Sequence, residues 1–142
     1  MDEGIFKPEP MGLKNDLLAL TLEERLTYDS KENLFFVNFE RYAVKTSQQI
    51  QEIKEAVERI VSPMGKKVYT IANYDNFSIL PDIMDEYSAM VKYLVDNYYT
   101  DVTRYTTSFF LRMKLGNALK KRDVALYIFE SGQAARRALG KG

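Results

Sequence analysis

The sequence predicts an α/β fold close to the α+β boundary, in which four helices pack on a mixed sheet of about four or five strands. Two strand-like stretches, 26–28 and 34–39, are joined by the polar run 29–33, which is typical of a hairpin. After this hairpin, short β-rich segments alternate with amphipathic segments of roughly 12–18 residues. Such alternation favours parallel pairing through right-handed crossovers.

The first helix is expected to follow the hairpin. Thr46 and Gln49 have the spacing of a capping box. The segment 62–65, with its proline and glycine, is expected to end the helix. The apolar residues expected on its buried face are Ile50, Ile53, Val57 and Ile60.

The best central strand is 68–73, VYTIAN, because its β-branched and aromatic residues suit burial on both faces. We expect a polar loop over 74–78 and a second helix that opens near Pro81 and Asp82. A stripe with helical spacing then favours a core contact over a cofactor site. Its members are Ile83, Tyr87, Met90, Val91, Leu94 and Tyr98.

Two strand and helix pairs complete the expected order. A strand over 102–105 precedes a third helix that runs to about Arg122. Its expected core residues are Phe109 or Phe110, Met113 and Leu119. A last strand over 125–129 precedes a helix capped by Ser131. Its expected buried side is Ala134, Ala135, Ala138 and Leu139.

Residues 1–27 are expected to form an arm or linker, and residues 28–142 a single α/β domain. Pro8, Pro10 and Gly12 interrupt regular structure in the arm, although short helical turns are expected over 15–20 and 22–26. Residues 1–10 are acidic and lack the apolar core of a secretory signal. No apolar run approaches the roughly 18 residues of a membrane span, so no membrane insertion is expected.

The chain contains no His and no Cys in 142 residues. It therefore lacks the usual general base near neutral pH, a thiol nucleophile and the commonest zinc ligands. We do not expect an enzyme that works on its own, nor a bound metal; catalysis would need paired carboxylates such as Asp75 and Glu130. The absence of Cys fits a reducing compartment, and cytoplasm is the expected location.

Charge is unevenly distributed along the chain. Residues 1–103 carry 11 Lys/Arg against 18 Asp/Glu, a balance of −7, whereas residues 104–142 carry 9 against 2, a balance of +7. Such asymmetry indicates either a docking face or basic helices that pair with acidic neighbours in the fold. Nucleic acid is not an expected partner, because the basic residues are not interleaved with aromatic residues.

The segment 102–116, VTRYTTSFFLRMKLG, carries the main candidate site. Its consecutive hydroxyl residues lie where a strand should pass into a helix, with Arg104 before them and Arg112 and Lys114 after. They could cap the helix themselves, or the helix N-terminus could bind an anion. The candidate ligand residues are Arg104, Tyr105, Thr106, Thr107, Ser108, Tyr74 and Asp75.

The order β-β-α-β-α-β-α-β-α resembles the STAS/SpoIIAA-like fold of anti-sigma-factor antagonists and anion-transporter domains. More specifically, the chain resembles the C-terminal extension of some bacterial acyl-CoA:acetate/3-ketoacid CoA-transferases. The segments that carry this resemblance are 6–14, 33–40, 73–77, 104–108 and 114–116.

The resemblance implies a non-catalytic accessory domain that binds a CoA-transferase catalytic domain, a second copy of itself, or both. The glutamate that forms the thioester in those enzymes belongs to a much larger domain, so Glu130, two residues before Gly132, is expected to be structural. Tyr98 and Tyr99 are expected to be exposed and to join the docking surface.

Two alternative functions remain open. One is a binding module for CoA or another phosphate-bearing ligand at the candidate residues above; no other cofactor is expected. The other follows from the STAS resemblance, which implies regulation by phosphorylation in the loop after the central strand. Asp75 matches the acidic position there, and Ser78 is the phosphorylation candidate, although Phe77 intervenes. Asp75 and Ser78 could equally do no more than organise a turn.

Overall fold

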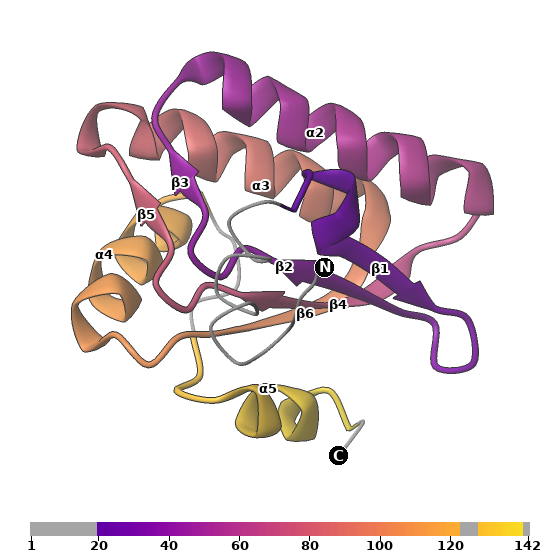
Figure 1. Ribbon diagram of the computed structural model, residues 1–142. Coiled ribbons are helices and arrows are strands. Elements are labelled where there is room, and N and C mark those ends of the chain that lie inside the picture. Colours follow the sequence, from indigo (N-terminus) through magenta and orange to yellow (C-terminus); the bar gives the residue numbers. More distant parts are fainter. Residues whose placement is uncertain (1–19, 123–127, 141–142) are drawn as a thin grey trace, which may run out of the picture.

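The computed structural model describes residues 20–122 and 128–140, and its centre is a mixed four-stranded sheet (Figure 1). The spatial order is β1-β2-β4-β6, in which β1 pairs antiparallel with β2 and the other pairs are parallel. The bounds are β1 (Leu26–Asp29), β2 (Leu34–Asn38), β4 (Val68–Asn73) and β6 (Tyr99–Tyr105). The predicted hairpin and mixed α/β sheet are confirmed.

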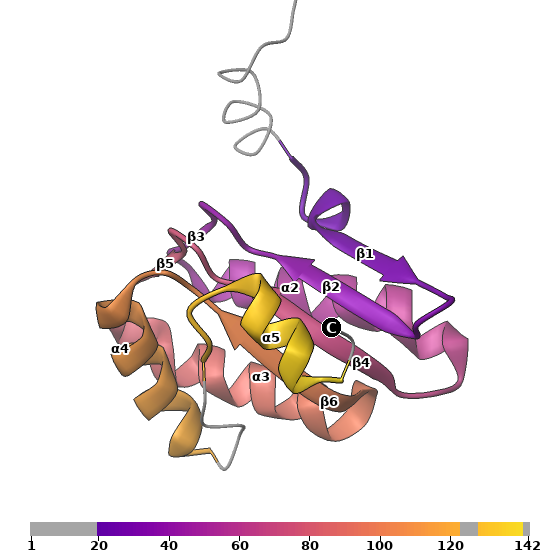
Figure 2. The same cartoon turned by 90° about the horizontal axis from the view of Figure 1, so that it is seen from below.

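The described part of the chain forms four α-helices around this sheet: α2 (Ser47–Val61), α3 (Met84–Tyr98), α4 (Phe109–Lys120) and α5 (Gly132–Ala138). Helices α2 and α3 lie side by side on one face, and α5 covers the other (Figures 1 and 2). Helix α4 packs against α3 at the end of the sheet. The main core fills the space between the sheet, α2 and α3, whereas a small cluster of Leu34, Ile71 and Ala135 lies under α5.

The predicted capping box begins α2. The Thr46 hydroxyl accepts a hydrogen bond from the Gln49 N–H at 3.1 Å, and the Gln49 side-chain oxygen accepts one from the Thr46 N–H at 3.2 Å. The helix passes into a 3₁₀ turn, η2 (Ser62–Met64), and ends at Gly65, whose φ of +68° is in the left-handed region that suits glycine. The predicted start and the predicted end of this helix are therefore both confirmed.

The segment VYTIAN is the predicted central strand, because β4 lies between β2 and β6. The second helix also matches the prediction: it begins with the 3₁₀ turn η3 (Pro81–Ile83) and continues as α3. The α3 stripe packs into the core through four buried residues, Tyr87, Met90, Val91 and Leu94.

The segment expected as a polar loop, 74–78, contributes two aromatic residues to the core, although Asn76 and Ser78 are exposed. Tyr74 is 3% exposed and Phe77 is 5% exposed, and their ring centroids lie 4.9 Å apart in an edge-on contact. Phe39 stacks on Phe77 at 5.9 Å. A second, two-stranded parallel sheet of β3 (Ala43–Val44) and β5 (Ser78–Ile79) lies beside this aromatic cluster and was not predicted.

Strand β6 begins at Tyr99 rather than Val102, because α3 passes into it directly. Tyr99 is consequently buried, with 8% of its surface exposed, and the expectation of an exposed Tyr99 was wrong. Tyr98 is half-buried, and its hydroxyl donates to the Glu58 carboxylate at 2.8 Å. These tyrosines hold α2, α3 and the sheet together instead of forming a free surface.

The expected orientation of α4 was wrong in part. Leu119 is buried, as predicted, but the exposed fractions are 68% for Phe109, 69% for Phe110 and 51% for Met113. Because α4 contacts the domain mainly through α3, only the stripe of Leu115, Gly116 and Leu119 reaches the interior. Neighbouring helical residues point about 100° apart, so one narrow stripe cannot include both phenylalanines.

Ser131 caps α5 as predicted, since its hydroxyl accepts the Ala134 N–H at 3.1 Å. Ala135 is buried, and Ala134 and Leu139 are half-buried. Ala138 is exposed, contrary to the prediction, because this helix of seven residues contacts the sheet through one narrow stripe. Most of the predicted last strand, 125–127, lies outside the described residues, but Phe129 forms a parallel bridge to Tyr105.

The predicted arm lies mostly outside the described residues, as do the motif 6–14 and most of the helical turn 15–20. Before β1, a 3₁₀ turn, η1 (Glu23–Arg25), packs on the domain. The buried Arg25 donates through Nη1 to the carbonyls of Asn38 at 3.0 Å and Glu40 at 2.8 Å. Leu26 belongs to the main core, so the domain body includes residues from η1 onward.

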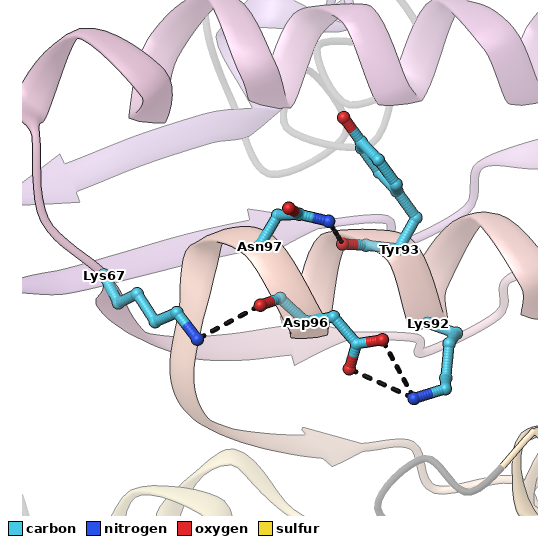
Figure 3. A network of polar contacts seen from close by, with 5 residues as sticks. All are labelled: Lys67, Lys92, Tyr93, Asp96 and Asn97. Carbon is cyan, nitrogen blue, oxygen red and sulfur yellow. Dashed lines mark hydrogen bonds and ion pairs between the residues drawn. The ribbon is translucent and has the colours of Figure 1, made fainter.

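Polar contacts secure the last turn of α3, where the chain enters β6 (Figure 3). Lys67, in the loop before β4, donates to the Asp96 carbonyl at 3.1 Å, and Lys92 pairs with the Asp96 carboxylate at 2.9 Å. Asn97 donates to the Tyr93 carbonyl at 2.8 Å. These contacts hold the helix end against the loop that precedes the central strand.

Candidate functional site

The hydroxyl residues after β6 cap α4. The Ser108 hydroxyl accepts a hydrogen bond from the Leu111 N–H at 3.1 Å, which is the predicted N-cap interaction. Thr106 is fully buried, and its hydroxyl accepts from the Ser108 N–H at 3.2 Å. Arg112 donates through Nη1 to the Thr106 carbonyl at 2.8 Å. The local hydrogen bonds therefore support capping.

A carboxylate already lies at this turn. Asp75 accepts from the Thr107 N–H at 3.0 Å and from the Thr107 hydroxyl at 2.6 Å. The contact exists because β4 and β6 are parallel neighbours, so the loops at their carboxyl ends meet. An anion bound here would have to compete with Asp75 for the donors of Thr107.

The other predicted ligand residues point elsewhere. Arg104 and Tyr74 are buried beneath α2 and α3, with exposed fractions of 1% and 3%. Tyr105 packs on the opposite face, where its ring lies so close to Gly132 that an added Cβ would be 3.1 Å away. Because successive strand residues face opposite sides, Arg104 and Tyr105 cannot serve one site. The structure therefore brings together Asp75 and Thr107 but separates them from Arg104.

A groove of about 640 Å³ lies between α4 and the segment that contains β5, η3 and the start of α3. One wall is apolar, with Phe77, Ile79 and Met84, and the other is formed by α4. The α4 residues that line it are Phe110, Leu111, Lys114, Asn117 and Ala118. Ser78, the phosphorylation candidate, is exposed and lines the same groove.

The groove continues into an exposed apolar area on α4. We call the groove together with Phe109, Phe110 and Met113 the α4 surface. Arg112 lies over the Phe109 ring at 5.8 Å and Lys114 over the Phe110 ring at 5.2 Å. Both rings are thus bordered by cations, as aromatic anchors at protein interfaces often are.

The charge of the α4 surface is positive. Lys114 and Lys121 line the groove. Its acidic residue, Asp85, forms an ion pair of 2.6 Å with Arg122, and this hydrogen bond lowers the pKa of the Asp85 carboxyl. A second ion pair, between Arg136 and Glu32 at 3.2 Å, also joins the basic C-terminal part to the acidic N-terminal part. Some of the basic C-terminal residues therefore pair with acidic residues within the fold, which is one of the two explanations that the charge asymmetry suggested.

The sequence indicated the turn before α4 as the candidate site and missed both the groove and the exposed phenylalanines beside it. Phe110, Lys114 and Lys121 are contributed to it by one helix, whereas its other wall comes from residues about 30 positions earlier. The available signal was the pair of adjacent phenylalanines, 109 and 110, because both cannot lie in one narrow buried stripe.

Within residues 20–122 and 128–140, no group of three or more Asp or Glu side chains is arranged to hold a metal ion. None of the helices in this part of the chain is long and apolar enough to cross a membrane. Comparisons with known protein families, curated proteins and solved structures found no match to this chain.

Proposed function

We propose that this chain is a non-catalytic interaction domain that binds a partner protein through the α4 surface. The observation that carries the proposal is the pair of phenylalanines, 68% and 69% exposed, beside an apolar groove. Soluble proteins rarely expose contiguous aromatic area unless it is used for binding. Aromatic side chains next to a pocket are typical anchors of protein interfaces.

The chemistry of this surface defines the partner. Lys114 and Lys121 line the groove, and Asp85 is neutralised by Arg122. A complementary partner would present an apolar or aromatic anchor flanked by acidic groups. The resemblance to CoA-transferase extensions favours the catalytic domain of such an enzyme as this partner. The STAS-like assignment of the fold and a cytoplasmic location belong to the same proposal.

A binding titration tests this proposal. The test substitution is Phe110→Ser. The matched control is Lys120→Ser, which alters an exposed residue of the same helix outside the groove. Binding to a CoA-transferase catalytic domain should weaken at least tenfold for Phe110→Ser and stay unchanged for the control. The positive rim also predicts weaker binding at higher salt.

Two outcomes would overturn the proposed partner. In the first, Phe110→Ser binds the catalytic domain as well as the unaltered chain does. In the second, the chain self-associates in sedimentation equilibrium, Phe110→Ser is monomeric, and no catalytic domain binds. The second outcome would assign the α4 surface to a homo-oligomer instead.

A second candidate function is control of this surface by phosphorylation at Ser78, and its support is that Ser78 is exposed and lines the groove. A phosphate there would add about −1.5 to −2 charges and would repel an acidic partner. Ser78→Glu should therefore weaken partner binding, whereas Ser78→Ala should not. Equal binding by both variants would contradict this role.

A further inference from the structure

A small cavity of about 30 Å³ lies in the interior, between the sheet and the helices α2 and α3. Thr70 and Arg104 line it from two neighbouring strands. In the parallel register Thr70 pairs with Val102 and Ala72 pairs with Arg104, so these side chains share the face that α2 and α3 cover. The hydroxyl-bearing rings of Tyr74, Tyr87 and Tyr99 complete its polar lining.

Two polar atoms in this lining lack partners. Arg104 is 1% exposed, and its Nη1 makes no hydrogen bond to any residue that the structure describes. Thr70 is also 1% exposed, and the same holds for its Oγ1. A buried cation is strongly unfavourable unless an opposite charge and hydrogen bonds compensate it.

The Tyr74 hydroxyl hydrogen-bonds with Arg104, but Arg104 Nη1 is left without an acceptor, so the lining has more donors than acceptors. A guanidinium can only donate, and the Tyr74 and Tyr87 hydroxyls, 2.9 Å apart, share one hydrogen bond and leave one O–H proton available. No Asp or Glu side chain is among the described residues that line the cavity. Burial raises the pKa of Tyr74, Tyr87 and Tyr99, so these phenols stay neutral and cannot balance the charge.

We propose that this cavity binds a small monovalent anion the size of chloride, held by Arg104 Nη1 and Thr70 Oγ1. The volume is about that of one water molecule, which excludes phosphates, carboxylate ligands and nucleotides. The anion would balance the positive charge of Arg104. It would also accept hydrogen bonds from the unpaired donors on β4 and β6. This structural site is independent of the α4 surface and of the proposed interaction function.

Thermal unfolding at constant ionic strength tests the site, with chloride replacing gluconate, which is too large for the cavity. The midpoint should rise by several degrees as chloride increases, because an ion that binds the folded state alone stabilises it. Arg104→Met should lose this dependence. The control Arg59→Met, at an exposed arginine on α2, should keep it.

The second variant is Thr70→Val, which removes the hydroxyl and nearly preserves the shape of the side chain. It tests the site even if Arg104→Met does not fold. It should need at least tenfold more chloride for the same rise in midpoint. Crystals grown in bromide should show an anomalous peak beside Arg104 Nη1 and Thr70 Oγ1. The proposal would be overturned if the unfolding midpoint does not change with chloride, or if the cavity in those crystals holds water and no bromide.

Discussion

Asp75 and Thr107 join the ends of two parallel strands, since one carboxylate oxygen accepts both the N–H and the hydroxyl of Thr107, at 3.0 and 2.6 Å. The contact links the segment after β4 to the turn before α4. It therefore fixes where α4, and with it the α4 surface, begins relative to the rest of the domain.

Removing this contact should destabilise the domain. Asp75→Ala and Thr107→Val should each lower the free energy of unfolding by about 1–2 kcal/mol, because each leaves a donor or acceptor of the turn unpaired. The double variant should lose less than the sum, with a coupling of at least about 0.5 kcal/mol. Denaturant unfolding of the four proteins measures this coupling, and strict additivity would contradict the contact.

The same contact bears on the predicted binding of CoA. Because Asp75 uses the donors of Thr107, we expect no rise in the unfolding midpoint of the unaltered chain with CoA. Asp75→Ala frees those donors beside the α4 N-terminus and should allow a measurable rise with CoA or inorganic phosphate. A clear rise in the unaltered chain with CoA, but not with phosphate, would favour the ligand-binding function instead.

The N-cap at Ser108 makes a separate prediction. Ser108→Ala should cost about 1 kcal/mol of stability, because the Leu111 N–H loses its acceptor. Ser108→Asn should restore most of that loss, since asparagine is an equally good cap. Urea unfolding of the three proteins tests this order, and an alanine variant as stable as the unaltered chain would exclude a capping role.

Buried tyrosines should make the domain sensitive to alkali. Burial raises the pKa of Tyr74, Tyr87 and Tyr99 in the folded state above the ordinary value of 10.0. A raised folded pKa means that stability is complete below pH 10 and falls as pH rises above it, because the unfolded chain releases these protons more easily.

Phenolate absorbance and circular dichroism, recorded together during an alkaline titration, measure this effect. Only part of the 10 tyrosines should ionise near pH 10, and the rest should ionise together with loss of helical signal. Ionisation of all of them near pH 10 with a native circular dichroism spectrum would contradict the burial of these three.

At low pH, Glu58 should make the stability of the fold depend on pH in the opposite direction. Hydrogen bonds from Tyr93 at 2.5 Å and Tyr98 at 2.8 Å lower the pKa of the Glu58 carboxyl below its ordinary value of 4.5. Its contribution is therefore present above pH 4.5 and is lost as pH falls through the lowered folded value. The size should be a fraction of a kcal/mol, because solvent screens this surface cluster.

The matched comparison is Glu58→Gln against Glu55→Gln, an exposed residue of the same helix. Urea unfolding below pH 4.5 should show a weaker pH dependence for Glu58→Gln than for the unaltered chain. Glu55→Gln should behave like the unaltered chain, and equal effects of the two substitutions would show that the tyrosines do not matter.

The sequence by itself determined the elements whose signals are local. The capping residues Thr46, Ser108 and Ser131 act within three positions of themselves, so their roles could be read without tertiary structure. The strand VYTIAN was equally clear from its β-branched and aromatic composition, and the α3 stripe was clear from its helical periodicity. The hairpin and a mixed sheet with parallel pairing also followed from the order of these elements, whereas the strand order came from the structure.

Tertiary structure alone decided which chemically distinctive residues meet. Arg104, two residues before Thr106, turns inward because strand residues alternate between faces, and no neighbouring residue reveals which face is covered. Phe109 and Phe110 remain exposed because α4 packs only along Leu115, Gly116 and Leu119. The groove and the Arg104 cavity each combine side chains from separate elements, and such contacts depend on packing that no local pattern encodes.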